Sequence, residues 1–173
     1  YELSDVGIIH VDDGFGRAYA RIYTDAYGAE NICHTVGYPS SALEFSEQIT
    51  AISEAGCDNI LVATYASDGA MLIDDIAQAG FNSIRLVSGH HPGFEGFPEL
   101  LEDKTAILGM VGGIPGNWTS PLQAGFDADY LSAFNSTAPA HAGASYDATM
   151  IMAKAVIQAG STTGSDVKAA IPV

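Results

Sequence analysis

The segment Val6-Gly7-Ile8-Ile9-His10-Val11, which ends at the polar turn Asp12-Asp13-Gly14, indicates the fold of this chain. A nearly continuous apolar run of this length is typical of a strand that is buried on both faces of a sheet. Similar runs begin every 21 to 28 residues along the chain, at residues 31–36, 59–64, 84–87 and 105–111. This regular spacing predicts a parallel sheet whose successive strands are joined by helices.

Amphipathic segments between these runs predict the helices that cover the sheet, the first of them over residues 17–27. Ser41 and Glu44 form the S-x-x-E pattern of a capping box, which predicts the start of the second helix, and Asp68 is expected to cap the third. The second helix is expected to bury an apolar face made of Phe45, Ile49 and Ile52. The glycines expected to end the three helices are Gly28, Gly56 and Gly80. With right-handed crossovers, this alternation predicts an α/β fold with a doubly wound, mostly parallel sheet flanked by helices.

The character of the sequence changes after residue 112. Residues 113–117, Gly-Ile-Pro-Gly-Asn, form a connection without a strand pattern. Three extra C-terminal helices are expected, at residues 122–134, 144–159 and 164–170. The helix over residues 144–159 is apolar on nearly every side, so we expect it to need a partner that this chain does not contain. We therefore expect residues 1–112 to form one α/β lobe and residues 113–173 to form a connection with further helices.

The chain is strongly acidic. Its 173 residues include 21 acidic and 6 basic side chains, which gives a formal net charge of −15. Such a surface repels phosphate backbones and anionic lipids, so nucleic acid and membrane surfaces are not expected as partners. The sequence contains no apolar run of the ~20 residues that a membrane span needs, and no signal peptide. Because it opens at Tyr1, almost directly at a strand, we expect it to be a piece of a longer protein.

The two cysteines, Cys33 and Cys57, are expected to be free thiols by default. Cys33 falls within a predicted strand, and Cys57 falls in the turn before another. A disulfide would need an oxidising compartment and a Cα separation of at most ~7 Å, which the sequence does not give. Pairing therefore stays open as the alternative.

Ligands of open parallel sheets bind beyond the carboxyl ends of the strands. The loops at those ends, residues 12–16, 65–68, 88–93 and 112–117, are rich in aromatic and polar side chains, which suits a small organic ligand. Asp12 and Asp13 do not indicate a phosphorelay receiver, because the third strand ends in Thr64-Tyr65 rather than in a carboxylate and the fifth contains no lysine. The two carboxylates are instead expected at a helix start, where the helix dipole favours them.

The motifs predict no catalytic centre, cofactor or metal. His90-His91 and the carboxylates near them lack the spacing of a metal site. Gly14-Phe15-Gly16 lacks the remaining residues of a phosphate-binding loop. Cys33 and His34 are neighbours in a predicted strand, so their side chains point to opposite faces and do not form a nucleophile–base pair. We therefore expect a binding module rather than an enzyme.

Short motifs along the chain have the order and spacing of a known family. Residues 7–17, Gly-Ile-Ile-His-Val-Asp-Asp-Gly-Phe-Gly-Arg, are similar to an I-x-x-D-x-x-Y-G-x opening, and Tyr38-Pro39 with Glu44-Phe45-Ser46 is similar to a Y-P-x-x-x-x-D-F-S segment. Further matching pieces are Leu61–Tyr65, Gly80-Phe81 and Tyr146-Asp147-Ala148. Over essentially the whole chain, these motifs resemble the second lobe of type I periplasmic solute-binding proteins, the Leu/Ile/Val-binding receptors of ABC importers.

The resemblance implies a two-lobed receptor that closes on a small polar solute, often an amino acid, and presents it to a membrane permease. It also implies a periplasmic or extracellular location and a first lobe that precedes Tyr1. Residues 113–173 would then pack on that lobe, and without it we expect the chain to self-associate through the helix over residues 144–159. A sensor or regulatory ligand-binding domain of the same fold is the alternative function.

The expected ligand-binding residues come from the strand-end loops and from the resemblance. The resemblance implies aromatic contacts at Phe15 and Tyr65, and another near His141. The full expected set is Phe15, Tyr65, Ser67, Asp68, Ser88, His90 and His141. This chain departs from the family's amino-acid receptors at Gly89 or His90, where they tend to hold a carboxylate for the ligand's ammonium group. Either another carboxylate (Asp12, Asp13 or Asp68) replaces it, or the ligand lacks an ammonium group.

Overall fold

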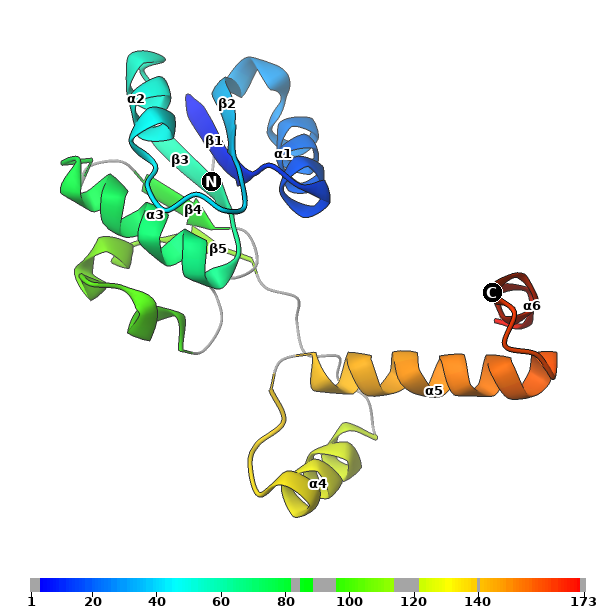
Figure 1. Cartoon of the computed structure of the whole chain (residues 1–173). Helices are drawn as coiled ribbons and strands as arrows, with labels where there is room; N and C mark the ends of the chain where they lie inside the picture. Colours follow the sequence, from blue (N-terminus) through cyan, green and yellow to red (C-terminus); the bar gives the residue numbers. More distant parts are fainter. Residues whose placement is uncertain (1–3, 82–84, 89–95, 114–121, 140, 172–173) are drawn as a thin grey trace. The chain divides into compact units, whose positions relative to one another are not determined.

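The computed structural model describes residues 4–81, 85–88, 96–113, 122–139 and 141–171. The chain forms two compact units, Tyr1–Pro115 and Gly116–Val173 (Figure 1). The first unit carries the sheet, and the described part of the second unit is helical.

The first unit is built on a parallel sheet of five strands (Figure 1). In chain order these strands are β1 (Val6–Val11), β2 (Ile32–Tyr38), β3 (Asn59–Ala63), β4 (Arg85–Ser88) and β5 (Val111–Gly112). Their order across the sheet is β2-β1-β3-β4-β5, and every neighbouring pair is parallel. The direction of winding reverses between β1 and β3, as in other doubly wound sheets, so the predicted fold class is confirmed.

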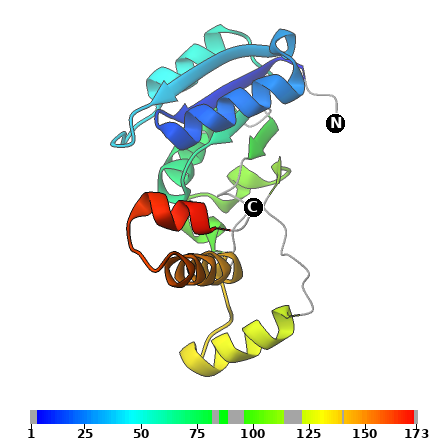
Figure 2. The ribbon, with the colours of Figure 1, turned by 90° about the vertical axis from the view of Figure 1, so that its right-hand side faces the viewer.

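Helices cover both faces of this sheet. The first helix, α1 (Gly14–Tyr27), lies on one side, whereas α2 (Ser46–Glu54) and α3 (Ala66–Gln78) lie on the other (Figures 1 and 2). Successive residues of a strand point to opposite faces. Val6 and Ile8 therefore pack in the core under α1, and Ile9 and Val11 pack in the larger core under α2 and α3. All four side chains are fully buried, as the apolar run over β1 predicts.

The start of α2 differs from the sequence prediction. The helix begins at Ser46, so the capping box expected from Ser41 and Glu44 is wrong. A contact from another helix takes its place, because Asp75 Oδ2 of α3 accepts the backbone N–H of Phe45 at 3.1 Å. The backbone N–H at this helix start is thus bonded to a residue 30 positions away along the chain. The sequence pattern had predicted a bond to a residue close by.

The start of α3 also differs, because Asp68 is not its capping residue. Tyr65 occupies that position without a side-chain hydrogen bond, and Asp68 lies in the first turn with its side chain buried. A second buried carboxylate of α3, Asp74, accepts the backbone N–H of Glu102 at 2.9 Å. The helix is therefore attached to the following loop by a polar contact as well as by its apolar face.

The fifth strand expected over residues 105–111 is wrong, since β5 is limited to Val111–Gly112. The first part of that range instead belongs to a short 3-10 helix, η4 (Lys104–Ile107). Two further 3-10 helices in the described part of this unit are η1 (Ala29–Asn31) and η3 (Phe97–Leu100). Asp103 Oδ1 accepts both the backbone N–H of Thr105, at 2.8 Å, and its hydroxyl, at 2.7 Å. Such local bonds favour a turn over an extended strand. Part of η4 still packs against the larger core, which explains the apolar pattern of this segment.

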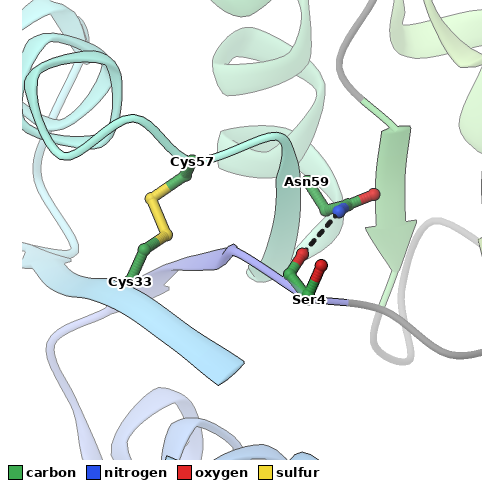
Figure 3. Close-up of a disulfide and its surroundings, with 4 residues drawn as sticks. All are labelled: Ser4, Cys33, Cys57 and Asn59. Atoms are coloured by element: carbon green, nitrogen blue, oxygen red, sulfur yellow. Dashed lines mark hydrogen bonds between the residues drawn. A yellow bond between two sulfur atoms is a disulfide. The ribbon is translucent and has the colours of Figure 1, made fainter. Parts of the chain in front are cut away.

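A disulfide joins Cys33 of β2 to Cys57 in the turn before β3 (Figure 3). The expectation of two free thiols is therefore wrong. The two Cα atoms are 5.9 Å apart, within the range that the bond requires. Gly7 of β1 leaves room for this packing, because a Cβ atom there would lie 3.1 Å from Cys57 Sγ and 2.6 Å from Ile52 Cδ1. Strand order decides the pairing, since β1 lies between β2 and β3.

Hydrogen bonds join the residues just before β1 to the start of β3, at the same end of the sheet as the disulfide. The side-chain amide of Asn59 donates to the backbone oxygen of Ser4 at 2.8 Å (Figure 3). The backbone N–H groups of Asp58 and Asn59 both donate to the backbone oxygen of Asp5, at 3.0 and 3.2 Å. We call this end of the sheet, with Ser4, Asp5, Asn59 and the two cysteines, the amino edge.

The described part of the second unit contains the helices α4 (Gln123–Phe134), α5 (Ala142–Ala159) and α6 (Gly164–Ala170). Each lies within two residues of its position in the sequence prediction. Large apolar side chains of α5 stay exposed, namely Met150, Ile151, Met152 and Ile157. Ala155 is the buried residue of this helix. Across the described residues, every helix is too short or too polar to cross a membrane.

Candidate ligand-binding site

Aromatic and acidic side chains gather where β1, β2 and β3 end. We call this end of the sheet the carboxyl edge, and its residues are Asp12, Asp13, Phe15, Tyr38, Thr64, Tyr65 and Asp68. The two helices that start there, α1 and α3, leave toward opposite faces of the sheet. Open parallel sheets bind ligands at this position, because the diverging helices leave the strand ends uncovered.

Phe15 and Tyr65 stack against each other at the carboxyl edge. Their ring centroids are 5.0 Å apart and their planes differ by 23°. Phe15 lies in the first turn of α1 and Tyr65 lies directly before α3, so the pair links the starts of the two helices. Tyr65 is 40% exposed. The pair offers a solute an aromatic surface with a polar hydroxyl at its rim.

Asp13 connects this aromatic pair to the start of α1. Its Oδ1 accepts the backbone N–H of Gly16 at 2.9 Å, and its Oδ2 accepts the hydroxyl of Tyr65 at 2.9 Å. The bond from Gly16, and secondarily that from Tyr65, lowers the pKa of the Asp13 carboxyl. The same bond to Asp13 raises the pKa of Tyr65. Near neutral pH the site therefore holds a carboxylate and a protonated phenol, and the expectation of a carboxylate at this helix start is confirmed.

Asp68 forms a second polar pair, with Tyr38 at the end of β2. The Tyr38 hydroxyl donates to Asp68 Oδ2 at 2.5 Å, and both side chains are buried. Burial, followed by the hydrogen bond to Asp68, raises the pKa of Tyr38 well above its usual range. Asp68 Oδ1 and Thr64 Oγ1 are also buried, and neither has a hydrogen-bond partner among the described residues. Within the described residues, the carboxyl edge therefore has two buried polar atoms without a hydrogen-bond partner.

The structure groups only part of the residues expected to bind ligand. Phe15, Tyr65 and Asp68 lie together at the carboxyl edge, and Ser67, which is exposed, precedes Asp68 in α3. Ser88 is the last residue of β4 and pairs with Val62 in the sheet. The other two are not grouped with them: His141 belongs to the second unit, where it precedes α5, and His90 lies outside the described residues.

Tyr38 lies at the carboxyl edge but was not among the ligand-binding residues predicted from the sequence. Its sequence signal was limited to its place in the Tyr38-Pro39 pair at the end of a strand. Nothing in that pattern indicates a partner 30 residues later in α3. The contact arises because β2 and β3 flank β1, so their ends lie at one edge of the sheet.

The histidines of the sheet differ in their surroundings. His10 is buried and its Nδ1 lies 2.8 Å from the backbone oxygen of Val11, as expected for a satisfied histidine in a strand. His34 is exposed, because β2 is an edge strand. Among the described residues, no group of three His, Cys, Asp or Glu side chains is placed to hold a metal ion. His90 and His91 lie outside those residues.

Comparison with known proteins gives one family and several structural neighbours. The family described as periplasmic binding protein matches residues 3–172 of this chain. A curated relative, the Leu/Ile/Val-binding protein homolog 8 of Brucella abortus, is 24% identical over 86 residues. That match covers 49% of this chain and 21% of the relative.

Two solved structures show the same fold. A periplasmic binding protein type 1 from Bordetella pertussis has a TM-score of 0.76 and 23% identity, over 96% of this chain and 49% of its own. A solute binding protein of an ABC transporter from Rhodopseudomonas palustris, in complex with 3,4-dihydroxy benzoic acid, has a TM-score of 0.68 and 19% identity, over 97% of this chain and 48% of its own. The chain thus spans about half the length of these structures. Since the family matches almost every residue and the fold agrees, the chain belongs to the type I periplasmic binding proteins.

Proposed function

We propose that this chain is a ligand-binding lobe of an ABC-importer substrate-binding protein, and that it captures a small polar solute such as an amino acid or a related compound. The observation that carries this proposal is the carboxyl edge, where half-buried Phe15 and exposed Tyr65 stack on each other and share this edge with Asp13 and Asp68. Aromatic faces bind the apolar part of a small solute, and carboxylates accept hydrogen bonds from its polar part. Membership of the periplasmic binding protein family supports a binding role.

We propose that capture leaves the solute chemically unchanged. The polar groups of the carboxyl edge support this, because they are held by one another and by the backbone. Asp13 is bonded to Gly16 and Tyr65, and Asp68 is bonded to Tyr38. A nucleophile activated by a neighbouring base requires a different arrangement.

The remaining expected residues are proposed as further solute contacts. Ser67 is the second residue of α3, Ser88 is the last residue of β4, and His90 follows β4 closely in sequence. His141, at the start of α5, is proposed to contact the solute once a complete receptor forms. Phe15, Tyr65 and Asp68 are the contacts with the strongest support, because the structure groups them.

The solute is proposed to bind between two lobes, of which this chain supplies one. Two facts support this: the chain spans about half of the solved relatives, and Tyr65 at the site is 40% exposed. The complete receptor would present the solute to a membrane permease from the periplasm or from outside the cell. The disulfide between Cys33 and Cys57 supports that location, because disulfides persist in oxidising compartments.

We propose that residues 1–112 form this lobe and that residues 113–173 pack on the other. Exposed apolar side chains of α5 support such a role, since burial of each large one stabilises by ~1.5–3 kcal/mol. Without that lobe, the chain should self-associate through α5, and light scattering should then report a dimer or larger assembly. Ile157→Asp should dissociate it, because Ile157 is 80% exposed and offers apolar area to a partner. A monomer with ordered, exposed helices would contradict this part of the proposal.

Saturation-transfer NMR with a panel of amino acids and small aromatic acids tests the binding role. We expect at least one solute to bind this chain, with a dissociation constant no tighter than roughly millimolar, because half of the contacts are missing. Tyr65→Ala should remove that binding. The matched control is Tyr146→Ala, which removes an aromatic side chain that is 54% exposed on α5. Absence of binding across the panel would contradict the proposal, and a micromolar constant would contradict its two-lobe part.

A further inference from the structure

We propose that the disulfide at the amino edge fixes the register of β2 and thereby positions Tyr38 beside Asp68 at the carboxyl edge. The disulfide lies near the start of β2 and Tyr38 is the last residue of this strand, so β2 connects the two edges. The consequence for solute capture rests on the proposed function, whereas the register of the strand does not.

The pairing of β1 with β2 has an irregularity at Cys33. Val6 of β1 pairs with Ile32 of β2. The next residue of β1, Gly7, pairs with His34 rather than with Cys33. Cys33 is therefore the extra residue of a β-bulge, a feature that is rare between parallel strands and that redirects side chains.

The two cores of the sheet show what this extra residue does. Ile32 packs against the core under α1, and Cys33 packs against the larger core under α2 and α3. Regular alternation from Cys33 would continue with the odd-numbered residues of β2 on the side of the larger core. The side chains that pack there are instead those of Val36 and Tyr38. The bulge thus reverses the alternation and places Tyr38 on the face that α3 covers.

Loss of the bulge would move Tyr38 away from its partners. A shift of one residue turns every following side chain of a strand to the opposite face of the sheet. Tyr38 would then point toward α1 and lose its hydrogen bond to Asp68 of α3. It would also leave the ring of Phe45, whose centroid lies 4.9 Å from that of Tyr38. The place of Tyr38 at the carboxyl edge therefore depends on keeping the extra residue near the start of β2.

The disulfide holds this extra residue in place. Burial alone specifies the register of β2 weakly, because β2 is an edge strand whose central residues, His34 and Thr35, are exposed. The covalent bond adds the missing constraint, since it joins Cys33 to Cys57, which is 5% exposed and belongs to the larger core. Gly7, opposite the bulge, leaves room for this bond, because a Cβ atom there would lie 3.1 Å from Cys57 Sγ.

NMR of the aromatic rings tests the proposal, because the rings of Tyr38 and Phe45 are close enough to give nuclear Overhauser effects in the native chain. Replacing both cysteines by serine should remove these ring contacts. Dithiothreitol should remove them in the native chain. Its two thiols close into a cyclic disulfide and pass two electrons and two protons to the cysteines, which become thiols. The matched control is Asn59→Ala, which removes the hydrogen bond to Ser4 at the same edge, leaves the bulge unchanged and should keep the ring contacts.

Deletion of the extra residue separates the register of β2 from the stability of the chain. With Cys33 deleted and Cys57 replaced by serine, regular alternation along β2 places Tyr38 on the side of the larger core. This deletion variant lacks the disulfide, as the double serine variant does, yet it should keep the ring contacts between Tyr38 and Phe45. If the disulfide contributed only stability, both variants would lose these contacts.

Ring contacts that survive in the double serine variant would overturn the proposal, and so would their loss in the deletion variant. If the double serine variant fails to fold, the deletion variant decides. A folded deletion variant with the ring contacts supports the proposal, and an unfolded one overturns it.

Solute binding distinguishes this inference from the proposed function. Titration with the panel of amino acids and small aromatic acids should show binding by the native chain and the deletion variant, and weaker binding by the double serine variant. Equal affinity of the native chain and the double serine variant for a solute would overturn the link between the register and the site. Absence of binding by all three chains would contradict the proposed function, while the ring contacts would still decide the register.

Discussion

The two edges of the sheet differ in how completely their contacts are satisfied. At the amino edge, the disulfide joins Cys33 to Cys57, and the backbone oxygens of Ser4 and Asp5 accept hydrogen bonds from the start of β3. At the carboxyl edge, Asp68 Oδ1 is buried without a partner among the described residues. The amino edge is thus held by a disulfide and by hydrogen bonds to the backbone. Within the described residues, the carboxyl edge has an unpaired oxygen of Asp68 and the exposed ring of Tyr65.

This difference indicates that contacts at the amino edge stabilise the first unit and that the unpaired buried atoms at the carboxyl edge destabilise it. Buried polar atoms without partners reduce the free energy of unfolding, so they persist where a ligand or water completes them. The disulfide and the hydrogen bonds at the amino edge offset this loss of free energy, and they lie away from the candidate ligand site. Four changes to the chain test this division, from the largest expected effect on the free energy of unfolding to the smallest.

Removing the disulfide should have the largest effect. Cys33 and Cys57 are 24 residues apart, and freeing a loop of this size lowers the free energy of unfolding by about 3 kcal/mol. Urea denaturation of the double serine variant, followed by circular dichroism, measures the loss. Dithiothreitol should destabilise the native chain by a similar amount and leave the variant unchanged. If the variant is as stable as the native chain, the disulfide does not stabilise the amino edge.

Tyr38→Phe should have the next largest effect, because it removes the donor to a buried carboxylate. With Oδ1 of Asp68 already unsatisfied, the loss of the hydroxyl leaves Oδ2 without its partner as well. Desolvation without compensation costs about 1–3 kcal/mol. Thermal unfolding provides the measurement, with Tyr146→Phe, whose residue is 54% exposed, as the control that should stay neutral. Equal stability of both variants would mean that the Tyr38–Asp68 bond contributes nothing net.

Asp68→Asn should change stability by less than about 1 kcal/mol, in contrast to Tyr38→Phe. The amide oxygen still accepts the Tyr38 hydroxyl, and the substitution removes a buried charge. Solute binding and stability should therefore separate in this variant, with binding weakened and unfolding nearly unchanged. Titration with a solute that binds the native chain, chosen from the panel of amino acids and small aromatic acids, and urea denaturation check both quantities. A loss of stability as large as that in Tyr38→Phe would show that the charge of Asp68 serves the fold rather than the solute.

The smallest effect is the pH dependence contributed by Asp13. Hydrogen bonds, first from Gly16 and then from Tyr65, lower its pKa in the folded chain below the ordinary value of 3.8. The unfolded chain binds a proton more readily in that window, so this contribution to stability is complete above pH 3.8 and is lost as the pH falls through the folded value. Asp13→Asn keeps the acceptor for the helix start and should flatten the acid limb of a stability–pH profile. An identical acid limb in the variant would contradict the assignment.

Sequence patterns were most successful where a single element determines the outcome. The apolar run over β1 predicted a strand buried on both faces, and Val6 and Ile9, which point to opposite sides, are both fully buried. Asp13 at the start of α1 was predicted from its place between a strand and a helix, and it accepts the N–H of Gly16. Both outcomes depend on contacts within a few residues or on the general two-sided burial of a parallel sheet.

Patterns failed where a side-chain hydrogen bond, distant or local, outweighed the apolar pattern of a segment. The capping box of Ser41 and Glu44 was displaced because Asp75 of α3 reaches the N–H of Phe45. Residues 105–111 have the composition of a strand, but the hydrogen bonds that Asp103 accepts from Thr105 favour a 3-10 helix over the first part of this segment. In each case a contact that periodicity does not register decided the local conformation.

The candidate site divides in the same way. The sequence alone determined that aromatic and acidic residues follow the first and third strands, which was enough to name Phe15, Tyr65 and Asp68. Only the tertiary structure decided that Tyr38 joins Asp68 and that Cys33 joins Cys57. Both bonds cross from β2 to the β3 side of the sheet, past β1. They depend on the order in which the strands pair, and a sequence that specifies each strand by its apolar pattern does not state that order.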